Sequence, residues 1–235
     1  MKKLITAILS IACTASFAQN GFFLQPEVGG GFGNADIAPS RNSYITNYNT
    51  QSIFSYQGQM NIGYNAGKWQ FITGIGYLRT GTTVKNGIYQ SFYPSVPENV
   101  FIPPVKITDY NPHIIVPVKI GYEVIRFSNK LSFTPFIGAE YAFNMPRTFV
   151  YPTTTRTESK LAFEDVCNNN GIIGLVDLNF TYRLSKHIDL TGGPSVNYMF
   201  TSMLNFKQEN DYAVLFNLGI KYNFNKGAAT IKKQL

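Results

Sequence analysis

The feature that most constrains this chain is an alternation of side chains across residues 111–145. Two runs, residues 111–126 and 131–145, flank a short polar turn at residues 127–130. Val116, Val118 and Ile120 share one parity with other apolar residues, whereas Lys119 and Gly121 share the other. A period of two predicts β-strands, because successive side chains leave a strand on opposite faces. Each run is about as long as the roughly 9–11 residues that a tilted strand needs to cross a bilayer. One apolar and one polar face together predict transmembrane strands.

The same alternation recurs along the chain and predicts eight strands. They are residues 21–33, 53–65, 69–79, 111–126, 131–145, 171–184, 188–203 and 212–224. Long connections (residues 34–52, 81–109, 146–169 and 204–210) alternate with short turns (residues 66–68, 127–130 and 185–187). The expected fold is therefore all-β: an eight-stranded antiparallel up-and-down transmembrane β-barrel with short periplasmic turns and long extracellular loops.

The first 18 residues read as a secretory signal peptide. Lys2 and Lys3 form a basic start, residues 4–15 are apolar, and residues 16–18 (Ser-Phe-Ala) form a small-x-small cleavage site. Lipoprotein processing at Cys13 is an alternative, but Ser10 stands where a lipobox has Leu or Val. We expect a signal peptide (1–18), a barrel (19–224) and a periplasmic C-terminal tail (225–235), located in the outer membrane of a Gram-negative bacterium.

Composition argues against several other classes of protein. Hydrophobic residues make up 44% of the chain, yet no apolar run after residue 18 is long enough for a spanning helix. Basic residues exceed acidic ones but are scattered, without the clustered face that nucleic-acid binding uses. The mature chain keeps one cysteine, Cys167, which can form neither an internal disulfide nor a zinc site. We therefore expect no nucleic acid, no metal and no cofactor.

Four prolines conflict with this interpretation of the strands. Pro26, Pro117, Pro135 and Pro194 lie inside expected strands, where each removes a ladder hydrogen bond. We expect bulges or strand ends at these positions.

Three segments, residues 70–77, 110–122 and 217–224, resemble strands of the PorT-like family of eight-stranded outer-membrane β-barrels. Residues 110–122, with Ile-Val-Pro-Val-Lys at 115–119, are similar to the fourth strand of that family. Residues 70–77 are similar to its third strand, with a Gly-x-Gly-Tyr ending, and residues 217–224 to its closing strand. The resemblance implies the barrel and not an activity, since most members are outer-membrane proteins of unknown role and a minority are named for protein secretion. The tail beyond Phe224 departs from the family pattern.

The inward-facing parity carries charged residues that we expect to form an interior network. They are Glu27, Lys119, Glu123, Glu140, Asp177, Arg183, Asp189 and Lys221. An eight-stranded barrel is only wide enough for side chains to fill it, and buried charges persist when paired and hydrogen-bonded. The network is therefore expected to be a polar plug that fixes strand register. A proton or ion path is the alternative.

Catalytic residues are not evident in this chain. His187 falls in a periplasmic turn, and His113 starts a strand at the outer rim, where a solvent-facing position is the simplest expectation. Cys167 is expected to be an incidental loop thiol, because no histidine is placed beside it. We expect a protein that is not an enzyme.

The long loops are the expected carriers of function, because a rigid scaffold typically presents binding residues on its connections. The loop at residues 81–109 holds a candidate contact patch: Tyr89, Phe92, Tyr93, Phe101 and Ile102. These residues fit a lid over the barrel, a hairpin that continues above the membrane, or a docking patch for a partner protein. The expected function is a structural or partner-binding scaffold; a component of a transport or protein-secretion assembly is the alternative. The expected partners are outer-membrane lipid and other outer-membrane or secretion-complex proteins.

Overall fold

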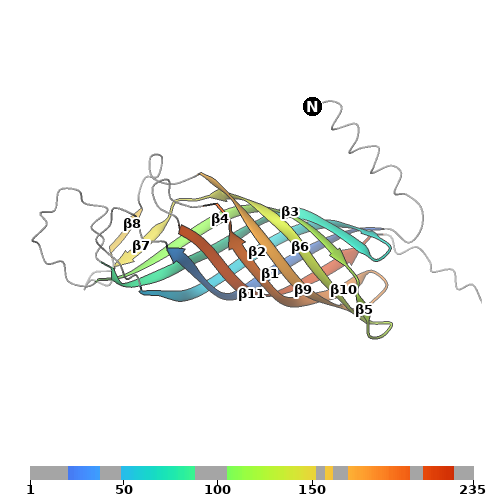
Figure 1. Cartoon of the computed structure of the whole chain (residues 1–235). Coiled ribbons are helices and arrows are strands. Elements are labelled where there is room, and N and C mark those ends of the chain that lie inside the picture. Colours follow the sequence, from blue (N-terminus) through green and yellow to red (C-terminus); the bar gives the residue numbers. More distant parts are fainter. Residues whose placement is uncertain are drawn as a thin grey trace, which may run out of the picture.

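The computed structural model describes residues 21–37, 49–87, 105–151, 157–160, 169–201 and 209–224. Eight long strands form its body: β1 (Gly21–Ile37), β2 (Asn49–Ala66), β3 (Trp69–Gly87), β4 (Val105–Tyr122), β6 (Leu131–Asn144), β9 (Asn170–Arg183), β10 (Ile188–Met199) and β11 (Glu209–Asn223). Three short strands accompany them: β5 (Ile125–Arg126), β7 (Thr148–Tyr151) and β8 (Thr157–Lys160). Figure 1 shows the strands running obliquely around one elongated barrel. Among the described residues, no helix is long and apolar enough to span a membrane.

The eight long strands close into a ring of antiparallel neighbours. β1 pairs with both β2 and β11, and the ring is completed by β4 pairing with β6. Closure removes the free strand edges that an open sheet would leave in lipid, where unpaired backbone groups are very costly. The eight-stranded antiparallel barrel expected from the sequence is thereby confirmed.

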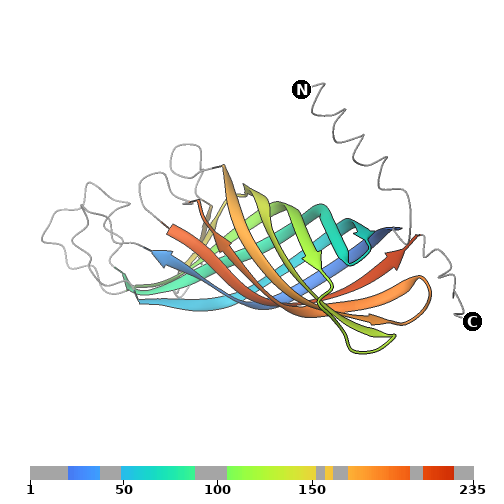
Figure 2. The same ribbon diagram turned by 45° about the vertical axis from the view of Figure 1, so that its right-hand side comes forward.

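The two ends of the barrel differ in the length of their connections. At one end, Gly67 adopts a positive φ of 63° and lets β2 turn directly into β3. β4 to β6 and β9 to β10 are joined by short turns at the same end, which Figure 2 shows at the right of the barrel. The strand ends that the long connections join lie at the other end. The expected signal peptide and the expected C-terminal tail lie outside the described residues.

Several strands run further than expected at the end with the long connections. β3 continues to Gly87 and β4 begins at Val105, so the expectation of a loop over all of residues 81–109 is wrong. The alternative of a hairpin that continues above the membrane is correct for residues 81–87 and 105–109. The short strands β7 and β8 also lie in the predicted loop at residues 146–169, and β7 pairs with β4. β-Branched residues at 82–84 and 107–108 favour this extended conformation.

The four prolines cause no bulge, contrary to expectation. Strand offsets stay constant across them: Leu24 pairs with Tyr222 and Glu27 with Gly219 on either side of Pro26. A proline removes a single donor, and the neighbouring hydrogen bonds keep the register. The register shifts of the described barrel strands fall instead between Ser52 and Tyr56 in the β2–β3 pairing, and between Val84 and Gly87 in the β3–β4 pairing. Both lie toward the end with the long connections.

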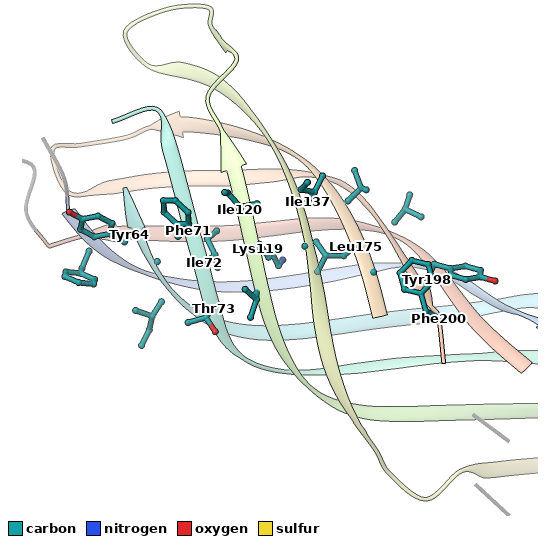
Figure 3. Close-up of a pocket in the computed structure, with 18 residues that line it drawn as sticks. Tyr64, Phe71, Ile72, Thr73, Lys119, Ile120, Ile137, Leu175, Tyr198 and Phe200 are labelled. Atoms are coloured by element: carbon teal, nitrogen blue, oxygen red, sulfur yellow. The ribbon is translucent and has the colours of Figure 1, made fainter. Parts of the chain in front are cut away.

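The outer surface of the barrel is a belt of exposed apolar side chains. Val118 is 64% exposed whereas the next residue, Lys119, is 4% exposed, so the two faces of β4 are opposite in character. Aromatic pairs border the belt: Trp69–Tyr122 (ring centroids 4.8 Å apart) at one end and Tyr198–Phe200 (5.5 Å) at the other. Figure 3 shows a shallow hollow on this surface, with Tyr64 and Phe71 at one side and Tyr198 and Phe200 at the other. A soluble monomer would not expose such a surface, so the barrel spans a membrane.

Glycines inside the barrel make room for aromatic rings at the end with the short turns. A Cβ at Gly63 would lie against the ring of Phe23, and one at Gly121 against the ring of Phe136. Phe23 and Phe136 pack together with Ile72 into an apolar layer. The absence of side chains at these two glycines is therefore required by close packing.

Candidate functional site

The interior of the barrel is the part of the molecule where charged residues gather, and it is built in layers along the axis. Inward positions of β4 show the order: Lys119, then Ile115, then His113 and Asp109, from the short-turn end outward. The corresponding positions of β11 are Asn217, then Leu215 and Ala213, then Asp211. Two polar clusters are thus separated by an apolar layer.

Lys119 is the centre of the inner polar cluster. Its Nζ donates a hydrogen bond to Oδ2 of Asp177 at 2.8 Å and lies 3.8 Å from Oε1 of Glu27. Glu27 also accepts a hydrogen bond from Gln25 (2.8 Å), and Glu140 accepts one from Gln59 (3.2 Å). All these residues are at most 7% exposed. Pairing and hydrogen bonding are what allow such charges to remain buried.

Amide side chains extend this cluster across the barrel. Gln57 donates to Asn217 at 2.8 Å, and Asn217 donates to Ser195 at 3.0 Å. β2, β10 and β11 are thereby joined through their side chains. Amide side chains on the inward face of the barrel thus form contacts between strands.

The other four predicted network residues lie near the short-turn end and form separate groups. Glu123 pairs with Arg126 beyond the end of β4 (2.9 Å), and this hydrogen bond raises the pKa of the Arg126 guanidinium. Arg183 is exposed, and its Nε lies 4.0 Å from Oδ1 of the buried Asp189. Lys221 donates to Asn65 (3.1 Å) and Gln70 (3.0 Å) and lies over the Phe23 ring. The structure therefore brings together Glu27, Lys119, Glu140 and Asp177. It does not join Glu123 and Arg183 to them, because Glu123 follows the end of β4 and Arg183 is the last residue of β9.

An apolar layer crosses the interior above the inner cluster. It consists of Leu78, Ile115, Ala142, Ile173, Met199, Ala213 and Leu215, from six of the eight barrel strands. The interior is therefore not the uniformly polar plug expected from the sequence. A small void of about 10 Å³ between this layer and the outer cluster is comparable to the space that a single water occupies.

The outer polar cluster was missed by the sequence analysis. Asp211 accepts hydrogen bonds from Thr80 (2.6 Å) and Asn111 (2.7 Å), and Arg147 forms a buried ion pair with Asp109. The expected strands were too short to include Thr80, Asp109 and Asp211, and Asn111 was only the first residue of one of them. Extending the inward parity of β4 back through His113, Asn111 and Asp109 would have shown the polar run.

His113 belongs to this outer cluster and is fully buried, so the expectation of a solvent-facing residue is wrong. Its Nδ1 lies 2.8 Å from Oδ1 of Asn144, and its Nε2 lies 3.4 Å from Oγ1 of Thr80. His187, in the turn between β9 and β10, is exposed, and its Nδ1 lies 3.0 Å from the carbonyl oxygen of Asn223.

No group of three or more His, Cys, Asp or Glu side chains able to hold a metal occurs in the described ranges. The predicted contact patch (Tyr89, Phe92, Tyr93, Phe101 and Ile102) and Cys167 lie outside the described residues.

Comparison with known proteins finds similar folds in solved structures. No protein-family model matches the sequence, and no curated protein matches it. Neisserial surface protein A is 16% identical over 87% of this chain and 97% of its own, with a TM-score of 0.42. A major outer membrane protein from Thermus thermophilus is 12% identical over 86% and 99%, with a TM-score of 0.47. The outer membrane protease OmpT from Escherichia coli is 11% identical over 87% and 94%, with a TM-score of 0.43.

The location of the protein follows from its own structure. A closed barrel of eight antiparallel strands, an apolar outer belt, aromatic residues at both borders and short turns at one end are the properties of bacterial outer-membrane barrels. This chain is an outer-membrane β-barrel. It lies in the outer membrane of a Gram-negative bacterium, and barrels of this kind generally have their short turns in the periplasm and their long loops outside.

Proposed function

We propose that this protein is a non-enzymatic scaffold that binds partner proteins through the extracellular end of its barrel. The observation that carries the proposal is the extension of β3 and β4 to Gly87 and Val105, well past the lipid-facing belt. Crossing the membrane does not require these residues, since ~9–11 residues are enough for one strand. Binding residues are commonly presented on such projections from a rigid scaffold.

The hairpin of β7 and β8 widens the extracellular sheet. β7 pairs with β4 through Thr108–Val150 and Asp109–Phe149, and β8 pairs with β7 on its other side. Within the described ranges, β8 has no strand on its outer side. An exposed strand edge can pair with an extended segment of another protein, which gives this sheet a route to a partner.

The packing of the interior supports a scaffold more than a channel. The apolar layer around Ile115 and Leu215 separates the two polar clusters, and both residues are at most 2% exposed. Side chains fill barrels of eight strands in general. A continuous polar route along the axis would need these residues to move apart.

The environment of His113 supports the non-enzymatic part of the proposal. A general base must reach the proton that it removes. His113 is fully buried beneath the outer rim and held by Asn144 and Thr80, and the void beside it is too small for a substrate.

A component of a transport or protein-secretion assembly is the second candidate. The resemblance of residues 110–122 and 217–224 to PorT-like barrels favours it, because a minority of that family is named for protein secretion. The same extracellular sheet would then contact other members of the assembly.

The proposal is tested by removing the β7–β8 hairpin. Tagged wild-type protein and a variant with residues 148–160 replaced by a short Gly-Ser link are purified from the native host in mild detergent. We expect a protein that co-purifies in fixed ratio with the wild type to be lost from the variant, while heat-modifiable gel migration shows that both barrels fold. Recovery of the same proteins with both forms would contradict a partner site on this sheet. Loss of exported proteins in a deletion strain would favour the second candidate.

A further inference from the structure

Arg79 stands on the outward face of β3 and is held between two tyrosine rings. Its guanidinium carbon lies 3.9 Å from the centroid of the Tyr110 ring on β4 and 5.4 Å from that of Tyr56 on β2. Tyr56 in turn packs beside Tyr77, with ring centroids 6.0 Å apart. Three adjacent strands thus supply an aromatic setting for one cation, an arrangement that orders the flat guanidinium group.

The position of Arg79 in the membrane follows from the residues on either side of it. Below it, the outward residues of β3 are Trp69, Phe71, Thr73, Ile75 and Tyr77, which belong to the lipid-facing belt. Arg79 is the next outward residue and therefore lies at the upper border of this belt. Since the long connections lie at this end, the border faces the outer leaflet.

Arg79 has no carboxylate partner among the described residues, and the outward face of the neighbouring strand β4 carries a further basic residue. Asp109, on neighbouring β4, points inward and pairs with Arg147. Lys106 is exposed on the same outward face of β4 as Tyr110, four residues further from the membrane. This face of β3 and β4 therefore offers fixed positive charge to an anion at the lipid boundary.

We propose that Arg79, with Tyr56 and Tyr110, binds a phosphate group of an outer-leaflet glycolipid. A guanidinium offers planar paired N–H donors that match two phosphate oxygens, and stacking of its face leaves these edges available. The outer leaflet of a Gram-negative outer membrane is rich in lipopolysaccharide, whose lipid A carries phosphates at the border of the hydrocarbon region, and Arg79 lies at the border of the lipid-facing belt. Lys106 lies where further anionic groups of the saccharide would extend. The site does not depend on the partner-binding role.

The binding is measured with the folded full-length mature protein in a neutral detergent. The probes are bisphosphorylated lipid A, the same lipid A with its phosphates removed, and inorganic phosphate. We expect Arg79→Gln to weaken binding of bisphosphorylated lipid A about tenfold. The dephosphorylated lipid should bind both proteins equally, and inorganic phosphate should not compete at concentrations similar to that of the lipid. Arg126→Gln is the matched control, since Arg126 lies at the periplasmic end, and it should bind like the wild type.

A second variant keeps the test decisive if Arg79→Gln does not fold. Tyr110→Leu retains the charge but removes the ring that orders it, and should also weaken binding of the phosphorylated lipid, whereas Tyr110→Phe should not. Equal affinity of the wild type, Arg79→Gln and Tyr110→Leu for bisphosphorylated lipid A would overturn the proposal. Equal affinity of the wild type for both lipids, or tight binding of inorganic phosphate alone, would also overturn it.

Discussion

Lys119 and Asp177 are 58 residues apart in sequence, and Nζ of the first lies 2.8 Å from Oδ2 of the second inside the barrel. Their strands, β4 and β9, are not neighbours, because β6 lies between them. Glu27 on β1 approaches the same ammonium group at 3.8 Å. The inner cluster therefore ties together strands that the backbone ladder does not connect, and each of its charges depends on Lys119.

Removal of this one cation should destabilise the folded barrel. Lys119→Ala leaves Glu27 and Asp177 without the ammonium group that they face, and breaking a buried pair typically costs about 3–5 kcal/mol. We expect the fast-migrating folded band in detergent gels to be lost at a lower temperature than in the wild type. Folding itself should survive, since the lipid-facing belt is untouched.

Lys186→Ala is the matched control for this loss of charge. Lys186 is exposed in the turn between β9 and β10, so its removal should leave the transition temperature nearly unchanged. An unchanged transition in Lys119→Ala would show that the inner cluster does not stabilise the barrel.

Two consecutive isoleucines test the apolar layer. Ile115 is fully buried in it, whereas Ile114 faces lipid and is 39% exposed. Ile115→Ala should leave a cavity and lower the free energy of unfolding by about 2–5 kcal/mol, as in protein cores generally. Ile114→Ala should cost clearly less, because lipid fills the space. Urea unfolding of both variants in lipid vesicles measures the difference, and equal losses would contradict a closely packed interior.

A third prediction follows from the close approach of the Phe136 ring to Gly121. A methyl group at Gly121 would lie against the buried Phe136 ring, so Gly121→Ala should overpack the interior and cost about 1–3 kcal/mol. Adding Phe136→Leu should restore part of the loss. Gly58→Ala is the control, because a Cβ there meets open space. If Gly121→Ala and Gly58→Ala unfold alike, the ring does not occupy this position.

Cysteine labelling tests the orientation of the barrel in the membrane. In a Cys167→Ser background, Lys106→Cys should react with a membrane-impermeant maleimide on intact cells, since Lys106 is exposed at the end with the long connections. Lys68→Cys and Lys186→Cys, in the two turns at the other end, should react only after the outer membrane is breached. The reverse pattern would invert the topology, and would also place Arg79 at the inner leaflet.

The barrel could be predicted from the sequence because lipid imposes a simple rule on every spanning strand. Outward residues such as Val118 and Phe216 must be apolar, so the period of two is visible without knowledge of the pairing. The ends of the strands could not be predicted in this way. Above the membrane that rule no longer applies, and β3 continues through Thr82 to Gly87 by backbone pairing with β4 and by side-chain contacts such as that between Thr83 and Thr108.

The interior sites were only partly predictable for a related reason. Parity identifies which residues face inward but not their height along the axis, which depends on the stagger between strands. Glu123 therefore looked like a partner of Lys119, although it lies beyond the end of β4 and pairs with Arg126. The apolar layer was missed because inward residues such as Ile115 and Leu215 are apolar, like the outward residues beside them. The alternation of apolar and polar residues is therefore blurred at these positions.

Solute passage through the wild-type protein tests the central claim, a closed interior that acts as a scaffold and not as a channel. The refolded protein is incorporated into liposomes for sugar-uptake measurements and into planar bilayers for conductance. The packing of Lys119 with Asp177 and of Ile115 with Leu215 predicts that sugars are excluded and that no steady conductance appears. Sugar entry or a steady conductance in the wild-type protein would contradict the closed interior and make the transport role the better account.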